Sequence, residues 1–212
     1  MENYIQANFK TSAVISIDTQ CDTLDDEALE IPGTSAAVPN IRRLLDVYRQ
    51  HKMPIIHVVR IYKPDGSNVD LCRKQAIENG DKIFLQGSRG CELAPGMFEP
   101  NSIKLDTELL LSGKVQTINT HEVILYKPRW GAFFNTPLES HLKNLGVDTL
   151  VFVGCNFPNC PRTSIYEASE RDFRIVLVAD AMSGVYPKGI EEMRDIGVVV
   201  ENTLNVVDAV NV

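Results

Sequence analysis

The sequence predicts an α/β protein of the doubly wound class, a three-layer sandwich with helices on both faces of a mostly parallel central sheet. Short β-branched runs alternate with helical patterns, and several runs are apolar at consecutive positions, as strands covered on both faces must be. The 212 residues, 44% apolar and 23% charged, suit one large α/β domain. We therefore expect a single domain over residues 1–212.

Five runs are predicted to be the strands of this sheet. They are AVISID, PIIHVVR, EVILYK, TLVFVG and RIVLVAD, at residues 13–18, 54–60, 122–127, 149–154 and 174–180. Residues 61–121 are less regular and rich in Gly, Pro and polar side chains, so we expect excursions that cap one end of the sheet.

Helical patterns lie between the strands. Segment 37–52 repeats apolar residues at a helical spacing, at Val38, Ile41, Leu44, Leu45 and Tyr48. Segment 136–146 opens with Thr-Pro-x-x-Glu and closes on Gly146, a common helix stop. Residues 189–200 predict a helix and a short strand, and residues 202–210 a closing helix whose apolar surface is one candidate for an oligomer contact.

Composition excludes several classes of protein. A net charge of -7 and a pI near 5.1 argue against a nucleic-acid partner. No apolar run reaches the length of a membrane span and the first residues do not resemble a signal peptide, so we expect a cytoplasmic protein without a membrane partner. Five cysteines at irregular spacings predict free thiols rather than a disulfide framework or a zinc site.

Three predicted strands end on reactive side chains. Asp18 follows the first strand, Lys127 follows EVILY, and Cys160 lies in the loop after TLVFVG. Ligands of open parallel sheets bind beyond the carboxyl ends of the strands, so these residues are expected to meet in one crevice. Pro161 marks a helix start, which places Cys160 at the positive end of the helix dipole. That end and a nearby ammonium both favour a thiolate nucleophile, while a carboxylate can carry its proton.

Each of these residues also has an ordinary structural interpretation. A lone cysteine after a strand is commonly a small buried hydrophobe, which is the interpretation we favour for Cys155. Asp18 is compatible with a turn or a helix cap, and Lys127 with a solvated loop charge. The three reactive residues together at strand ends favour a catalytic site over three separate structural roles.

The sequence resembles the isochorismatase-like cysteine hydrolases, which include nicotinamidases, N-carbamoylsarcosine amidases, ureidoacrylate and biuret hydrolases and isochorismatase. The resemblance rests on IDTQ, on YKPRWGAFFNTPLE and on GCNFPNCPRTSIYEA, three motifs in the family's order. It implies that Asp18, Lys127 and Cys160 are catalytic and that the backbone amides of Asn156 and Cys160 form the oxyanion hole. The chain departs from the family in carrying Pro161 after the nucleophile and the bulky Phe157 in the preceding loop.

The resemblance also guides the predictions for metals and substrate. Nicotinamidases carry an Asp and several His as a metal site, but the matching HVVRIYKPDGSNVDLCRK has only His57, so we predict no metal and no cofactor. Basic, amide and aromatic side chains fill this region and the later loops instead: Arg60, Tyr62, Lys63, Asn68, Arg73, Arg129, Trp130 and Arg162. Any single one is by default a surface charge, yet one or two arginines suit a substrate with a carboxylate or several carbonyls. The residues predicted to bind substrate are Gln20, Arg60, Tyr62, Trp130, Phe157 and Ser164.

These observations predict a metal-independent cysteine amidohydrolase. Its substrate would be a small amide or ureide of the biuret, ureidoacrylate or N-carbamoyl amino acid type. Two alternatives are an isochorismatase-type vinyl-ether hydrolase, whose relatives lack a cysteine at the position of Cys160, and a non-catalytic scaffold that kept the fold. Family resemblance further implies a homo-oligomer, either a dimer or a tetramer.

Overall fold

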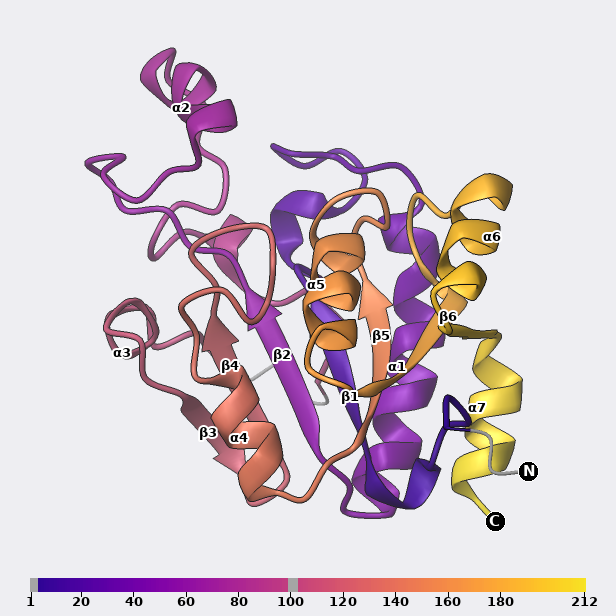
Figure 1. The fold of residues 1–212 in the computed structure, drawn as a ribbon. Helices are drawn as coiled ribbons and strands as arrows, with labels where there is room; N and C mark the ends of the chain where they lie inside the picture. Colours follow the sequence, from indigo (N-terminus) through magenta and orange to yellow (C-terminus); the bar gives the residue numbers. More distant parts are fainter. Residues whose placement is uncertain (1–3, 99–102) are drawn as a thin grey trace.

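The computed structural model describes residues 4–98 and 103–212 and contains a seven-stranded sheet in the order β3-β4-β2-β1-β5-β6-β7 (Figure 1). The strands are β1 Ser12–Ile17, β2 Ile55–Val59, β3 Gln116–Asn119, β4 Glu122–Tyr126, β5 Thr149–Gly154, β6 Arg174–Met182 and β7 Val199–Glu201. All neighbouring pairs are parallel except β3 and β4. The predicted fold class is confirmed.

Helices connect these strands. They are α1 Thr34–Gln50, α2 Leu71–Glu78, α3 Thr107–Leu111, α4 Leu138–Asn144, α5 Cys160–Ser169, α6 Pro187–Asp195 and α7 Thr203–Val210. Three short 3-10 turns, Phe9–Thr11, Cys21–Thr23 and Arg89–Cys91, complete the described regular structure. The predicted segments 37–52 and 136–146 correspond to α1 and α4, and the C-terminal prediction to α6, β7 and α7.

Two apolar cores, one on each face of the sheet, make the protein a three-layer sandwich. On one face, Leu142 of α4 and Ile165 of α5 pack with Ile15 and Phe152 of the strands. On the other face, α1 and α7 pack against strand residues of the opposite parity. Figure 1 shows α4 and α5 in front of the sheet and α1 behind it. Because successive strand residues face opposite sides, both core faces need apolar residues, which explains the unbroken apolar runs in the sequence.

The segment 61–121 contains more regular structure than its sequence predicts. It supplies α2, α3 and the antiparallel edge strand β3. Residues of β3 alternate between half-buried and exposed, and its sequence QTIN is mostly polar, so it carries no continuous apolar signal. Helix α2 projects from the body of the molecule beyond the strand ends (Figure 1), and none of its residues is buried.

Gly154 closes β5 where no other residue fits. Its φ of 115° lies in the left-handed region, and a Cβ atom there would stand 2.2 Å from the carbonyl oxygen of Ile17. The backbones of β1 and β5 therefore approach closely at the point where both strands deliver their loops.

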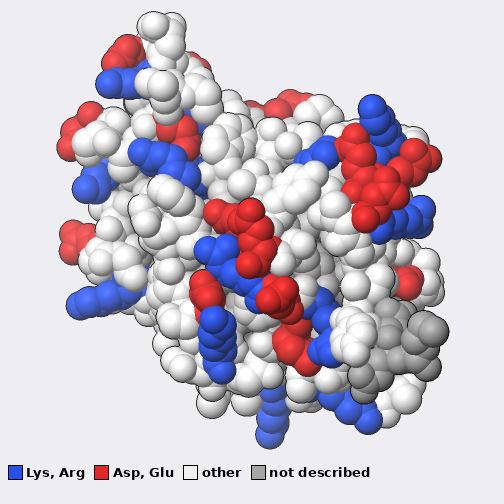
Figure 2. All heavy atoms as spheres, viewed as in Figure 1, with Lys and Arg blue, Asp and Glu red and all other residues white. Residues whose placement is uncertain are grey.

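Charges of both signs are interleaved over α4 and α5 on the face shown in Figure 2. The ion pairs of Glu139 with Lys143 and with Arg171 belong to this face. Exposed pairs of this kind contribute little to stability. Within the described ranges, no helix combines the length and apolarity needed to cross a membrane.

Candidate active site

The candidate site lies where the strand order reverses. Strand β1 is central, with β2 and β4 on one side and β5 on the other. Asp18 follows β1 and Lys127 follows β4, and their backbone N–H groups still donate to Val58 and Val59 of β2, at 2.9 and 3.0 Å. Asp18 has a φ of 46°, an uncommon conformation for a residue other than glycine and one that often marks a functional site.

Asp18 and Lys127 form a buried ion pair. Nζ of Lys127 lies 2.8 Å from Oδ2 of Asp18, with the two side chains 0% and 7% exposed. The ammonium also donates to the carbonyl oxygen of Arg129, at 3.3 Å. Oδ1 of Asp18 accepts no hydrogen bond of normal geometry from the described residues. Lys127 thus binds one carboxylate oxygen of Asp18, and the other oxygen has no hydrogen-bond partner among the described residues.

Cys160 is the first residue of α5 and its side chain is almost sealed from solvent, at 5% exposure. Burial raises the pKa of its thiol, and the negative charge of Asp18 raises it further. Lys127 and Arg60 act in the opposite direction without reversing the shift. Lysine and the helix start were expected to favour the thiolate, but they are outweighed by burial, so the resting group is a thiol beside a carboxylate.

The loop between β5 and α5 presents two backbone amides. Among the hydrogen bonds of the described residues, neither N–H of Asn156 nor N–H of Cys160 donates to a protein group. The loop is held around them by other bonds, since Phe157 N donates to Ser183 O at 2.8 Å and Asn159 N to Asn156 O at 3.0 Å. Two free donors on a braced loop are what an oxyanion hole requires.

Arg60 brings a second cation to the thiol. Its side chain is buried, and Nη2 lies 3.9 Å from Sγ of Cys160. Asp70 binds Nη1 at 2.7 Å, and the carbonyl oxygens of Pro128 and Arg129 accept from the guanidinium at 3.0 and 2.7 Å. Arg60 is therefore fixed beneath the loop that follows β4.

Asp70 is a site residue that sequence reasoning missed. Its Oδ2 accepts from Arg60 and also from the hydroxyl of Tyr62, at 2.5 Å. The sequence signal was ambiguous because Asp70 directly precedes α2, where an aspartate usually caps the helix; its side chain makes no capping bond. The predicted residues Arg60 and Tyr62 thus belong to one buried network with Asp70.

The side-chain amide of Gln20 forms hydrogen bonds with the backbone. Nε2 donates to the carbonyl oxygens of Arg60 and Cys91, at 2.8 and 2.5 Å, and Oε1 accepts from Arg60 N at 2.7 Å. This side chain is fully buried, so it joins the ends of β1 and β2 and fixes the backbone of Arg60. Gln20, which was predicted to bind substrate, therefore holds the backbone in place and has no exposed surface to meet a ligand.

Ser164, Phe157 and Trp130 surround the start of α5. The hydroxyl of Ser164 donates to Cys160 O at 2.7 Å and accepts from Ala132 N at 3.0 Å, which ties the helix to the loop after β4. Phe157 is fully buried and packs edge-on against Tyr186. Trp130 is partly buried against the core cluster that contains Cys160. Of these three, Trp130 is the one with surface left to meet a ligand.

Unpartnered polar atoms gather at this site. Five buried side-chain nitrogen or oxygen atoms of the described residues lack a hydrogen bond, and three of them are Asp18 Oδ1, Arg60 Nε and Asp70 Oδ1. Buried polar groups are nearly always satisfied, because an unpaired one costs about 1–3 kcal/mol. Their concentration around Cys160 is typical of a site built to receive a polar molecule.

His57 lies elsewhere in the fold. It is fully buried in the middle of β2 and its Nε2 lies 2.9 Å from Glu122 Oε1. Burial lowers the pKa of His57 despite the neighbouring carboxylate, so the ring is neutral at pH 7 and donates from Nε2. Across residues 4–98 and 103–212, no three His, Cys, Asp or Glu side chains gather where they could hold a metal ion.

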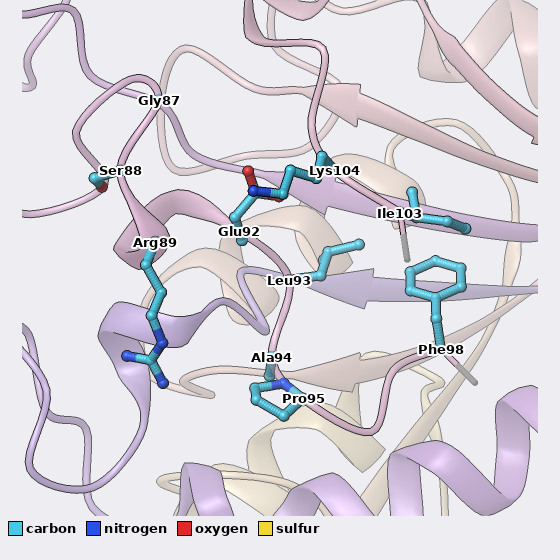
Figure 3. Close-up of a pocket in the computed structure, with 10 residues that line it drawn as sticks. All are labelled: Gly87, Ser88, Arg89, Glu92, Leu93, Ala94, Pro95, Phe98, Ile103 and Lys104. Atoms are coloured by element: carbon cyan, nitrogen blue, oxygen red, sulfur yellow. The ribbon is translucent and has the colours of Figure 1, made fainter. Parts of the chain in front are cut away.

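Cys155 is buried in the loop before Asn156, and burial raises the pKa of its thiol to about 12. It therefore stays protonated and packs as a small apolar side chain. A separate hollow of about 400 Å³ is lined by residues within 87–98 and by Ile103 and Lys104 (Figure 3). Its walls combine apolar residues such as Leu93 and Phe98 with the charged Arg89 and Glu92, and none of the three strand-end residues lines it.

Fold and site together define a doubly wound α/β protein with a cysteine, a carboxylate and an ammonium at the strand ends. The isochorismatase domain model matches residues 12–204, so the chain belongs to the isochorismatase family, a family of hydrolases. It is 28% identical to a probable inactive nicotinamidase of Arabidopsis thaliana, over 90% of this chain and 91% of that protein.

Two further comparisons agree with this membership. The chain is 24% identical to a ureidoacrylate amidohydrolase of Methylobacterium radiotolerans, over 79% of this chain and 62% of that protein. The crystal structure of an isochorismatase family protein from Desulfovibrio vulgaris is 28% identical, with a TM-score of 0.79 over 95% of this chain and 99% of that one. The predicted family is confirmed.

Proposed function

We propose that this chain is a metal-independent cysteine amidohydrolase that cleaves a C–N bond of a small amide or ureide. The observation that carries this proposal is the geometry of Asp18: Lys127 binds its Oδ2, its Oδ1 has no hydrogen-bond partner among the described residues, and its charge acts on the thiol of Cys160. A carboxylate held in this way can take the thiol proton at the moment of attack and return it to a leaving nitrogen.

The reaction runs in two halves. Asp18 takes the proton of Cys160 as sulfur bonds to the substrate carbonyl carbon, and the amides of Asn156 and Cys160 hold the oxyanion. The C–N bond then breaks as Asp18 gives that proton to the departing amine or ammonia. In the second half, Asp18 takes a proton from water as the water oxygen bonds to the thioester carbonyl carbon, and the C–S bond then breaks as Asp18 returns that proton to the sulfur, which restores the thiol and the carboxylate. Apart from the substrate and one water molecule, every group in this sequence belongs to the protein.

The raised pKa of Cys160 fits this order of events. A thiol that is protonated at rest needs a base for each turnover, and Asp18 is that base. Lys127 and Arg60 are the cations near the Cys160 sulfur, on which negative charge develops. Once Asp18 holds the thiol proton, the charge of Lys127 offsets the negative charge on sulfur or on the oxyanion, since Arg60 is already paired with Asp70.

Substrates of the biuret, ureidoacrylate or N-carbamoyl amino acid type suit the polar surroundings. The unpartnered donor on Arg60 and the unpartnered acceptors on Asp18 and Asp70 match a molecule that carries both N–H and carbonyl groups. The named activity of the relative from Methylobacterium radiotolerans, hydrolysis of a ureidoacrylate, lies in the same chemical class.

The alternative is a protein that kept the fold without the chemistry, a possibility raised by the relative named a probable inactive nicotinamidase. Ammonia release from biuret, an N-carbamoyl amino acid, a ureidoacrylate analogue and nicotinamide separates the two. We expect release from a ureido compound, its loss in Cys160→Ala, and full activity in Cys72→Ser, which removes an exposed thiol. Release that persists at the same rate in Cys160→Ala would refute the proposed nucleophile.

A further inference from the structure

Arg73 is a cation near the site that has no carboxylate partner in the described structure and whose side chain lies against two aromatic rings. It lies on α2, and the one hydrogen bond of its side chain to the described residues runs from Nη1 to the hydroxyl of Tyr62, at 3.3 Å. The centre of its guanidinium lies over the rings of Phe84 and Trp130, at 5.7 and 5.8 Å from their centroids. Arg60, by contrast, is already neutralised by Asp70.

The position of Arg73 on its helix is also unusual. No residue of α2 is buried, and its first residue, Leu71, is 87% exposed. Arg73 of this projecting helix nevertheless places its guanidinium over two aromatic rings of the body. Contacts with aromatic rings use the face of a guanidinium and leave N–H groups on its edge free to bind.

A continuous series of contacts joins Arg73 to the thiol. Tyr62 receives the hydrogen bond of Arg73 and donates to Asp70, Asp70 binds Arg60, and Arg60 lies 3.9 Å from Sγ of Cys160. Two members of this series, Arg60 and Asp70, are more than nine-tenths buried and carry unpartnered polar atoms. Arg73 therefore stands at the outer end of a polar site whose inner end is the nucleophile.

We propose that Arg73 binds an anionic group of the substrate, a carboxylate, and so selects ureido or N-carbamoyl acids over neutral ureides. This proposal rests on the proposed function and assigns the charge of its substrate. Guanidinium binds carboxylate through paired hydrogen bonds, and Arg73 has four of its five N–H donors uncommitted among the described residues.

A pair of alkylating probes tests the assignment without requiring turnover. Iodoacetate and iodoacetamide are nearly the same size and differ by one negative charge; each bonds carbon to the Cys160 sulfur and releases iodide. The rates are measured at Cys160 by peptide mass spectrometry in a Cys72→Ser background, because Cys72 is exposed and adjacent to Arg73. The quantity of interest is the ratio of the iodoacetate rate to the iodoacetamide rate.

We expect Arg73→Gln to lower this ratio about tenfold, the scale of one charged hydrogen-bonded contact, and Arg73→Lys to lower it less. Lys74→Gln is the matched control, since it removes the same charge from the neighbouring exposed position of α2, and it should leave the ratio unchanged. An unchanged ratio in Arg73→Gln, or an equal fall in Lys74→Gln, overturns the proposal.

Substrate kinetics give a second readout. In Arg73→Gln, kcat/KM for an N-carbamoyl amino acid should fall about 10-fold to 100-fold, mainly through KM, while kcat/KM for biuret stays within about twofold. Equal losses for both substrates would show that Arg73 serves only the structure. Absence of all turnover would refute the proposed function, whereas the alkylation ratio would still decide whether Arg73 binds an anion.

Discussion

Lys127 reaches 2.8 Å from Asp18 with its whole side chain removed from solvent. A buried ammonium is tolerated only when an opposite charge and hydrogen bonds compensate its lost hydration. Lys127 has both, in Asp18 and in the carbonyl oxygen of Arg129. The pair therefore fixes where the carboxylate points and leaves one of its oxygens for the thiol of Cys160.

The charge on Asp18 raises the pKa of the Cys160 thiol, so removing that charge lowers it. At pH 7 we expect iodoacetamide to alkylate Cys160 about tenfold faster in Asp18→Asn than in the unmodified protein, while this variant no longer hydrolyses substrate. Exposed Cys72 serves as the internal control, with an unchanged rate. Slower alkylation at Cys160 in this variant would mean that Asp18 activates the thiol even at rest.

Breaking the buried pair from one side should be costly. Lys127→Met leaves the carboxylate of Asp18 buried without its cation, and we expect a loss of about 3–5 kcal/mol in the free energy of unfolding. The double variant Asp18→Asn with Lys127→Met removes both charges. Its loss in the free energy of unfolding should be smaller, by about 2 kcal/mol, than the sum of the losses of the two single variants. Denaturant titration measures all three, and strict additivity would argue against a coupled pair.

Gly154 is required by sterics rather than by chemistry. In Gly154→Ala the new Cβ meets backbone atoms of Ile17 and the residue keeps a φ of 115°, so we expect a loss of at least about 3 kcal/mol in unfolding free energy. Gly113→Ala is the matched control, because its φ is 83° but nothing lies within 4 Å of the added Cβ. It should cost about 1 kcal/mol. Comparable losses at both sites in thermal unfolding would contradict the steric explanation.

The ionisation of Glu122 should make the free energy of unfolding depend on pH in the acid range. Burial alone would raise its pKa, but hydrogen bonds from His57 and Arg49 outweigh it and lower the pKa to about 2. A folded pKa below the ordinary value of 4.5 means that the contribution is complete above pH 4.5 and is lost as pH falls towards 2. The difference corresponds to on the order of 3 kcal/mol.

Denaturant titration across this pH window checks the prediction. Glu122→Gln should lower stability at pH 7 and flatten its dependence on pH between 4.5 and 2. The exposed Glu191 gives the control variant Glu191→Gln, which should keep the profile of the unmodified protein. An unaltered slope in Glu122→Gln would place the acid sensitivity at other groups.

The sequence predicts the layers and the meeting point of the site for a general reason. Continuous apolar runs separated by helical patterns allow few folds other than a parallel sheet, and the carboxyl ends of its strands share one edge. Asp18, Lys127 and Cys160 are brought together by that rule alone. Their catalytic roles stay a prediction that the variants above test.

The side-chain network around these three residues could not be predicted in the same way. Asp70 resembles a helix cap in the sequence, and Gln20 resembles a ligand group until its three bonds to the backbone are seen. The direction of the Cys160 pKa depends on burial, which no local pattern encodes. Edge strand β3 was missed because a polar, half-exposed strand carries little apolar signal.

The strand order of the sheet also matters during folding. Asp18, Lys127 and Cys160 are on the order of a hundred residues apart in the sequence, so they meet only when the strands on both sides of β1 have paired with it. Until then Cys160 is an ordinary solvated thiol, easier to ionise than in the finished fold. Folding therefore shelters this sulfur from indiscriminate electrophiles and oxidants in the same step that assembles its partners.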